Sequence, residues 1–547
     1  MNREQSMLIG IGVAGLLTAC RAQQSVKQPN IIIILADDMG YSDLGCYGSE
    51  INTPNIDKLA QNGIRFTNFY NAARSCPSRA SLLTGLYPHQ AGMGAMERDY
   101  NHPSYRGHIE ERATTIAEVL AQNGYNTYHV GKWHVGEAEP YRPLKKGFQK
   151  EFTLIDGASS YYNLAPYRHG GDSGMMTYNG KKFCPGEKFY MTDAFTGYAE
   201  RFIREDDDKP FFMYLAYTAP HWPLHALPED INKYKGKYMI GWDSVRMQRY
   251  KRMLELGVIP QNTRLSDRPE DLMPWDSVAG TDRELWDARM AVYAAMIDRM
   301  DQGIGRIIEL LRNKNEFENT LIIFLSDNGG CPERMTNTTY PTDGAIGSDR
   351  SFPTYWAYWA NVSNTPYRYY KAWVQEGGIK TPFIAHWPEK IAGGQMNTTT
   401  TGHIMDLMAT VLDVAGAKYP LKLGDRIITP TPGLSLLPAF IGKNIPGHDT
   451  LCWEHEGAKA IKIGEWKLVC NKFSVTGQGW NDNTRWQLFN LKDDPSEILD
   501  VTDNNAQIVV NMKAAYRKWA DKLMVLEMDT VKMIRRELNL NRKVKDE

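Results

Sequence analysis

Four side chains with oxygen donors stand directly after two apolar stretches of the sequence. They are Asp37, Asp38, Asp327 and Asn328. The stretches, residues 31–35 and 320–325, are typical of strands buried on both faces of a parallel sheet, and open α/β sheets place ligands at the carboxyl ends of such strands. Hard oxygen donors without an accompanying His or Cys suit Ca²⁺ or Mg²⁺ better than zinc. Taken alone, an Asp pair after a strand is more often a helix cap or a turn, so a metal site requires that the two strand ends meet.

A second group of polar residues has types and spacing suited to anion chemistry. Lys132 and His134 follow a strand candidate at residues 127–130 and alternate along the chain, so both can point at one site while Trp133 turns into the core. Arg79 offers a fixed fork of donors that can bind an anion or neutralise carboxylates. By themselves, a Lys-x-His pair and an Arg are more often surface residues.

The stretch from Ser75 to Gly85 carries the pattern S-x-P-S-R-x-x-x-L-T-G. This pattern resembles the signature of the type I sulfatase family, part of the alkaline phosphatase superfamily, in which the first residue, a Cys or a Ser, is oxidised to formylglycine and becomes the nucleophile. Counting back two positions from Pro77 and four from Arg79 leads to Ser75. The resemblance therefore implies a Ser-type sulfatase of the arylsulfatase-like branch, with Cys76 as a bystander.

The chemistry of an aldehyde explains why such a residue would be made. In water the aldehyde becomes a geminal diol, in which one hydroxyl attacks sulfur while the other later loses its proton and expels sulfate. An unmodified serine would be left as a stable sulfate ester. The resemblance thus implies a protein partner, an anaerobic-type (radical) sulfatase-maturating enzyme.

The resemblance also implies roles for the metal-binding and basic residues. The metal of the family, usually calcium, is implied at Asp37, Asp38, Asp327 and Asn328 together with the modified Ser75. The segment from Gly131 to Gly136 resembles the family's G-K-W-H-x-G, which implies that Lys132 bridges nucleophile and sulfate and that His134 takes the proton when sulfate leaves. The two lysines of the family site, Arg79 and a dication would together counter the charge that develops on the sulfuryl oxygens.

Two further positions are carried over from the family. His221 resembles the sulfate-contacting histidine, and an imidazole can donate the proton that a leaving alkoxide needs; His225 is the competing candidate. Lys371, five residues before Glu-Gly-Gly, resembles the second sulfate-binding lysine. Lys380 is expected to order the loop instead.

Composition and the first residues bear on the cellular setting. The chain has 547 residues, 42% of them hydrophobic, and a formal net charge of −1, which provides no basic field for nucleic acid or for an anionic membrane. Residues 1–22 have the features of a targeting segment that ends in a lipobox-like Leu17-Thr18-Ala19-Cys20. We expect an exported, periplasmic protein anchored only by a lipid on Cys20; a plain signal peptide with an incidental cysteine is the alternative.

Strand and helix patterns alternate through most of the chain. Strand candidates lie at residues 31–35, 127–130, 211–216, 320–325 and 383–386, and helical periodicity at 55–61, 115–122, 282–311 and 404–414. This alternation predicts an α/β catalytic domain, residues 28–435, with a large, mostly parallel sheet flanked by helices. The resemblance implies the same alkaline phosphatase-like fold.

A change in composition marks the second domain. Pro and Gly crowd between residues 430 and 450, and short alternating segments follow at 460–463, 466–469 and 486–491. These predict an antiparallel meander, and residues 511–525 a helix. The expected unit, residues 436–547, is a C-terminal α+β subdomain.

The predicted reaction is hydrolysis of an organic sulfate ester to an alcohol and inorganic sulfate. A sulfated carbohydrate is the expected substrate, with aryl sulfates turned over in vitro. Residues 337–370 are expected to form a long loop beside the site, in which Tyr355, Trp356 and Trp359 either stack on sugar rings or pack the loop. Two alternatives stay open: a metal-dependent phosphatase or phosphodiesterase that uses Ser75 directly, and a non-catalytic lipoprotein that binds sulfated glycans.

Overall fold

The computed structural model describes residues 27–166, 173–334, 343–470 and 485–545. The predicted targeting segment and Cys20 lie outside the described residues, so export and lipid attachment stay predictions. Within the described ranges, no helix has the length and apolar character needed to cross a membrane.

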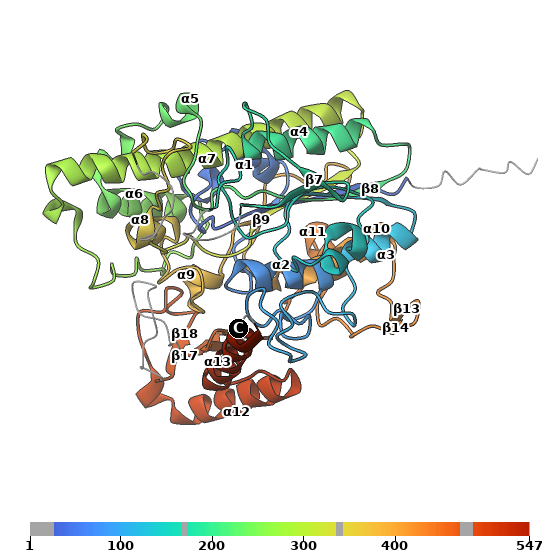
Figure 1. Ribbon diagram of the computed structural model, residues 1–547. Coiled ribbons are helices and arrows are strands. Elements are labelled where there is room, and N and C mark those ends of the chain that lie inside the picture. Colours follow the sequence, from blue (N-terminus) through green and yellow to red (C-terminus); the bar gives the residue numbers. More distant parts are fainter. Residues whose placement is uncertain (1–26, 167–172, 335–342, 471–484, 546–547) are drawn as a thin grey trace, which may run out of the picture.

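A ten-stranded mixed sheet forms the centre of the described structure (Figure 1), in the order β11-β2-β10-β9-β1-β8-β4-β5-β6-β7. Its middle consists of parallel strands: β9 (Thr320–Ser326), β1 (Asn30–Ala36), β8 (Phe211–Ala216), β4 (Asn126–Lys132) and β5 (Lys150–Leu154). The outer strands are β10 (Phe383–His386), β2 (Ile64–Phe66), β11 (Gln395–Asn397), β6 (Met176–Tyr178) and β7 (Lys181–Phe183). Strand β10 runs antiparallel to both of its neighbours, and β6 and β7 are antiparallel as well. The predicted α/β fold is confirmed, with a parallel centre and antiparallel pairings on either side of it.

Helices cover both faces of this sheet. One face packs against α1 (Pro54–Gln61), α4 (Met191–Arg204) and the long α7 (Gly280–Asn313), and the other against α2 (Ser75–Thr84), α3 (Ile116–Gln122) and α10 (Asp406–Ala415). Strand β1 explains why: Ile32 and Ile34 belong to the first core, while Ile31, Ile33 and Leu35 belong to the second. An unbroken apolar strand is therefore buried on both sides, as the sequence predicted.

The remaining elements are short or peripheral. They are β3 (Phe69–Tyr70), α5 (Pro228–Ile231), α6 (Trp242–Glu255), α8 (Trp356–Ser363), α9 (Glu376–Ile379), β12 (Gly402–His403), β13 (Lys422–Leu423), β14 (Arg426–Ile427) and α11 (Leu437–Phe440). Helix α11 contributes Ala439 and Phe440 to the core of the large sheet, and Leu436, just before the helix, joins them. The chain therefore still packs with the catalytic domain just after residue 435, where the C-terminal subdomain was expected to begin.

The C-terminal unit contains the predicted antiparallel meander and one strand more. Its strands are β15 (Thr450–His455), β16 (Ala458–Ile463), β17 (Trp466–Cys470) and β18 (Gln487–Asn490). Helix α12 (Ala506–Lys522) covers this sheet through Val509, Met512 and Tyr516. Strand β15 and helix α13 (Met528–Lys545) had no clear sequence signal.

The predicted long loop at residues 337–370 is only partly a loop. Its described part contains α8, in which Trp359 is fully buried and donates its indole N–H to the Trp286 carbonyl at 3.0 Å. Tyr355 is also buried and stacks on Tyr293, with ring centroids 4.3 Å apart. These two aromatic residues therefore take the second of the two roles left open by the sequence, because they pack the fold.

Candidate active site

The four predicted metal ligands leave the sheet side by side. Strands β1 and β9 are adjacent and parallel, so the residues that follow them meet at one edge. Asp37, Asp38, Asp327 and Asn328 are all buried. The Asp38 backbone N–H donates to Asp327 Oδ1 at 3.2 Å, and Asn328 Nδ2 donates to Asp38 Oδ1 at 2.7 Å. The condition set by the sequence, that the two strand ends meet, is fulfilled.

Ser75 lies against this cluster at the first residue of α2. Its Oγ is 3.1 Å from Asp37 Oδ1 and 3.2 Å from Asn328 Oδ1. A hydroxyl has a single proton to donate, so it can satisfy only one of these two oxygens at a time. The N-terminus of a helix also favours negative charge. The residue-75 side chain therefore sits where oxygen atoms crowd and an anion is stabilised.

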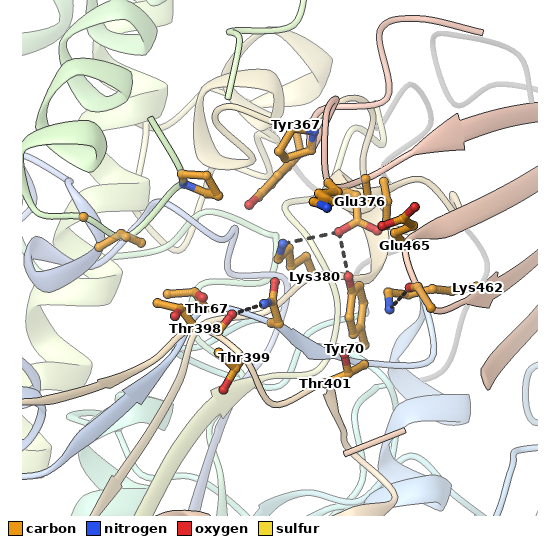
Figure 2. A pocket seen from close by; sticks show the side chains of 18 residues that line it. Thr67, Tyr70, Tyr367, Glu376, Lys380, Thr398, Thr399, Thr401, Lys462 and Glu465 are labelled. Atoms are coloured by element: carbon orange, nitrogen blue, oxygen red, sulfur yellow. Dashed lines mark hydrogen bonds and ion pairs between the residues drawn. The ribbon is translucent and has the colours of Figure 1, made fainter. Parts of the chain in front are cut away.

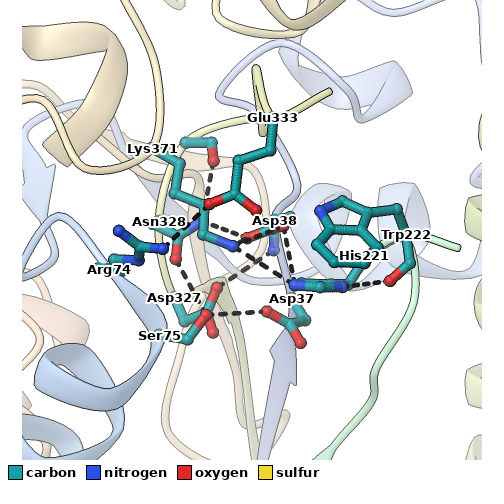
Figure 3. A network of polar contacts seen from close by, with 12 residues as sticks. Asp37, Asp38, Arg74, Ser75, His221, Trp222, Asp327, Asn328, Glu333 and Lys371 are labelled. Carbon is teal, nitrogen blue, oxygen red and sulfur yellow. Dashed lines mark hydrogen bonds and ion pairs between the residues drawn. The ribbon is translucent and has the colours of Figure 1, made fainter. Parts of the chain in front are cut away.

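Each carboxylate of the cluster has a basic partner. Lys132, at the end of β4, places Nζ 2.5 Å from Asp37 Oδ2, and Lys371 places Nζ 2.9 Å from the Asp38 carboxylate. Arg79 donates from Nε and Nη2 to Asp327 Oδ2 at 3.1 and 2.9 Å. Figure 3 shows the contact of Lys371 with Asp38 and, beside it, that of Ser75 with Asp37.

Burial and charge act against each other on these carboxylates. Burial works to raise the pKa of Asp37, but Lys132 and then His221, Arg79 and Lys371 lower it on balance. Burial and the neighbouring Asp37 raise the pKa of Asp327, against the pull of Arg79. A bound dication would favour the charged form of both carboxylates.

His221 points one ring nitrogen at this network. Its Nδ1 is hydrogen-bonded to the Trp222 carbonyl, so Nδ1 carries the proton of the neutral ring, and Nε2 lies 3.4 Å from both Asp38 Oδ2 and Lys371 Nζ. Burial lowers the pKa of His221 to about 4, although Asp38 and Asp37 oppose this shift. In the enzyme without substrate, the His221 ring is therefore neutral at pH 7, and the lone pair of Nε2 faces the site.

The competing candidate, His225, has a structural role. Its Nε2 lies 2.6 Å from the Ser351 carbonyl, and its Nδ1 accepts from the Tyr161 backbone N–H at 3.3 Å. Both ring nitrogens thus bind backbone groups. Lys380 likewise does not join the site residues: it pairs with Glu376 at 3.5 Å and lies over the Tyr367 ring at 4.7 Å, as a loop-ordering residue should.

His134 lies at the margin of the site. Trp133 is fully buried, as expected, and the His134 ring turns toward Glu97, with 3.3 Å between His134 Nε2 and Glu97 Oε2. Burial, followed by the charges of Lys132 and Arg79, lowers the pKa of His134 well below its ordinary value. Within the described residues, no hydrogen bond joins His134 to Ser75.

Two residues of the network were not foreseen from sequence. Arg74, just before Ser75, forms an ion pair with Glu333 at 3.0 Å (Figure 3). It forms another with Glu456 of the C-terminal subdomain at 3.4 Å. Despite burial, Asp38 and, more weakly, Glu333 raise the pKa of Lys371. The position of Arg74 next to Ser75 could have indicated its role, whereas nothing in the sequence around Glu333, in a loop after Gly330, indicated one.

The residues fit a hard divalent cation. Three carboxylates, an amide oxygen and the residue-75 oxygen lie together, and ligand atoms of Asp37, Asp38 and His221 lie within 4.8 Å of one another. Such oxygen-rich sets bind Ca²⁺ or Mg²⁺. The cluster can therefore hold a cation beside a nucleophile while two lysines bind an anionic group.

Comparison with known proteins agrees with this chemistry. Residues 29–417 match the family model described as Sulfatase, and residues 367–522 match that described as N-sulphoglucosamine sulphohydrolase, C-terminal. An uncharacterized sulfatase of Schizosaccharomyces pombe is 33% identical over 90% of this chain and 93% of its own length. The arylsulfatase of Klebsiella aerogenes is 35% identical over 76% of this chain and 92% of its own length.

A solved structure extends the similarity to the whole fold. That of Ps i-CgsB in complex with k-i-k-neocarrahexaose superposes with a TM-score of 0.66 at 28% identity, covering 94% of this chain and 98% of that one. The motifs, the site geometry and these matches lead to one conclusion. This chain belongs to the type I sulfatase family of the alkaline phosphatase superfamily and is a sulfuric ester hydrolase.

Proposed function

We propose that this sulfatase hydrolyses sulfated carbohydrate through a formylglycine made from Ser75, with one Ca²⁺ held by Asp37, Asp38, Asp327, Asn328 and residue 75. The observation that carries the proposal is the position of Ser75 Oγ, 3.1 Å from Asp37 and 3.2 Å from Asn328 at the head of a buried helix. The single proton of this hydroxyl cannot satisfy both acceptor oxygens, so a cation bound here would stabilise the oxygen atoms that face one another.

The charge of the site supports a sulfate ester as ligand. The cationic side chains of Arg79, Lys132 and Lys371 balance the carboxylates of Asp37, Asp38 and Asp327. A dication added to this balanced set gives the pocket a net positive charge, which attracts the singly charged sulfate ester. Ca²⁺ would polarise a sulfate oxygen, and a formylglycine diol would supply the attacking oxygen and the later route to sulfate release.

The chain's own residues bind sulfate and move protons. Lys132 and Lys371 orient the sulfate oxygens and stabilise the charge that develops on them. His221 presents Nε2, which gives a proton to the leaving alcohol oxygen once the anionic substrate favours the protonated ring. His134 receives the proton that residue 75 loses when sulfate is released.

The rival functions have less support. A zinc phosphatase would favour His beside Asp at the end of β9, where this chain has Asp327 and Asn328. A non-catalytic binding protein has no need of buried proton-transfer groups such as His221. For the substrate, the support is the related structure with neocarrahexaose bound.

Maturation and cellular setting are part of the proposal. We infer an anaerobic-type maturating enzyme as partner because the modified residue is a Ser. Export to the periplasm, with a lipid on Cys20, rests on the pattern of residues 1–22.

Mass spectrometry of the matured protein tests the nucleophile. The peptide that contains Ser75 should be lighter than its unmodified form by two hydrogen atoms, the difference between an alcohol and an aldehyde. Ser75→Ala should release no sulfate from sulfated saccharides or nitrophenyl sulfate, while Cys76→Ala, the neighbouring control, should still acquire the modification. An active Ser75→Ala enzyme would refute the assignment.

A further inference from the structure

Three side chains of types that bind metals lie together outside the hard-oxygen cluster, and one of them, Cys76, directly follows the nucleophile in the sequence. Cys76, Glu97 and His134 offer a thiol, a carboxylate and an imidazole whose ligand atoms lie within 4.8 Å of one another. They come from α2, from the segment after Gly94 and from the segment after β4. Cys76 is fully buried and His134 is 8% exposed, so the cluster is sheltered from solvent.

One distance in the cluster matches the spacing of two ligands in a tetrahedral metal site. His134 Nε2 and Glu97 Oε2 are 3.3 Å apart, and two nitrogen or oxygen ligands ~2.1 Å from a tetrahedral ion lie about 3.4 Å apart. The cysteine is a free thiol. Within the described residues, the buried His134 Nδ1 has no hydrogen-bond partner. Small side-chain shifts would therefore complete three ligands around an ion.

The donor set selects a different class of metal from the calcium site. Thiolate and imidazole ligands suit Zn²⁺ and similar thiophilic ions, whereas Ca²⁺ takes oxygen ligands. We propose that Cys76, Glu97 and His134 form a second metal site, which takes Zn²⁺ and inhibits the enzyme. The fourth position of such a site is open to water.

A metal ion bound at this site would inhibit the enzyme by blocking the proposed proton transfer to His134. Coordination by His134 occupies a lone pair of the ring, and the ion adds positive charge beside residue 75. The Cys76 thiol releases its proton to solvent as sulfur coordinates. The effect on turnover rests on the proposed role of His134, but binding of the metal does not. Glu97, whose side chain is 14% exposed, offers the route from solvent.

Metal binding can be measured without turnover. Full-length Ser75→Ala protein saturated with calcium is titrated with Cd²⁺, a zinc analogue whose thiolate complexes absorb in the ultraviolet. We expect one equivalent to give a cadmium–thiolate band that disappears in Ser75→Ala/Cys76→Ser. The matched control is Ser75→Ala/Cys184→Ser, which lacks an exposed thiol far from the cluster in sequence and should keep the band.

Zinc inhibition of the matured, calcium-saturated enzyme is the second readout. Cys76→Ser and Glu97→Gln should each raise the half-inhibitory Zn²⁺ concentration at least about tenfold, because loss of a metal ligand weakens binding no less than loss of a supporting contact. Cys184→Ser should match the unchanged enzyme.

Equal zinc sensitivity of Cys76→Ser, Glu97→Gln and the unchanged enzyme would overturn the proposal, as would a cadmium band that survives Cys76→Ser. Should Cys76→Ser fail to fold, Glu97→Gln decides. An active Ser75→Ala enzyme would instead refute the proposed function and leave the cadmium result intact.

Discussion

The buried charges of the active site and those that join the C-terminal subdomain to the catalytic domain are built from the same kinds of side chain. In the second network, Lys467 Nζ lies 2.8 Å from both Glu376 Oε1 and Glu497 Oε1. Tyr70 donates to Glu376 Oε2 at 3.0 Å, and the Glu376 backbone N–H donates to Glu497 Oε2 at 2.7 Å (Figure 2 shows Tyr70, Glu376 and Lys380). Both networks join segments that are far apart in the sequence.

The difference lies in how the oxygen atoms are satisfied. In the subdomain network a lysine, a tyrosine or a backbone N–H faces the carboxylate oxygens, so a further cation is not needed. In the active site, Ser75 Oγ shares one proton between Asp37 and Asn328. A cavity of about 780 Å³ beside the second network is lined by Tyr70, Glu376 and Lys380, and none of the predicted site residues lines it. The paired charges around Lys467 therefore join the two domains. The closely spaced oxygen atoms around Ser75 indicate the cation site.

Among the tests of this difference between the two networks, removal of calcium should have the largest effect. Chelation should abolish sulfate release, because the oxygen cluster loses its ion, and added calcium should restore it. At a calcium concentration of 100 Kd the ion should also stabilise the fold by about 2.7 kcal/mol. Sulfate release and urea unfolding with and without chelator measure both effects. Full restoration by zinc alone would favour the phosphatase alternative.

A matched pair of lysine variants separates the two networks. Lys467→Met leaves Glu376 and Glu497 buried without their lysine and should cost about 3–5 kcal/mol of unfolding free energy, with turnover per folded molecule little changed. In calcium-loaded Lys371→Met the ion still neutralises Asp38, so turnover should fall with a smaller loss of stability. The urea midpoint and kcat of each variant measure these effects. A larger loss of stability in Lys371→Met and a larger loss of turnover in Lys467→Met would show that the two networks have been assigned to the wrong roles.

Leaving-group dependence sharpens the view of the active site. His221→Ala should slow hydrolysis of a sugar sulfate by about 10²–10⁴-fold, since a basic alkoxide needs a proton, and nitrophenyl sulfate much less. His134→Ala should slow both substrates alike and give a burst of phenol, because it acts after the S–O bond breaks. Steady-state and pre-steady-state rates on both substrates measure this. Equal losses in His221→Ala on the two substrates, matching those in His134→Ala, would remove the proposed division of roles.

The last prediction concerns the buried histidine His129, whose ring is hydrogen-bonded to Thr153. Burial lowers the pKa of His129 to about 3, whereas the unfolded chain has a value of about 6.5. The unfolded state therefore binds an extra proton between these values, and stability falls as pH drops from about 6.5 toward 3, by roughly 1.4 kcal/mol per unit. His129→Phe should flatten this slope in urea unfolding.

The control is Thr153→Val, because Thr153 Oγ1 lies 2.7 Å from His129 Nδ1. This variant removes the same hydrogen bond but keeps the imidazole, so it should keep the slope. A slope unchanged in His129→Phe would mean that the ring is protonated in the folded state or that other groups dominate acid unfolding.

Much of the architecture was readable from the sequence because strands and strand ends are local features. The runs at 31–35 and 320–325 predicted buried strands since nearly every side chain is apolar, and both are buried strands. The residues that follow them could be named as one cluster because parallel strands end at one edge. Part of the segment predicted as a loop at residues 337–370 is instead the helix α8. The sequence could not decide the role of its aromatic residues, since an aromatic residue is equally suited to a core and to a binding loop.

By itself, then, the sequence determined the α/β fold, the nucleophile motif and the charged residues around it, because each depends on residue type and short-range spacing. Only the tertiary structure decided that Arg74 meets Glu456 of the C-terminal subdomain and that His134 turns toward Glu97 beside Cys76. It also separated His221 from His225, which lie four positions apart. These contacts join distant segments or depend on where a ring nitrogen finds a partner, and neither is encoded in a local pattern.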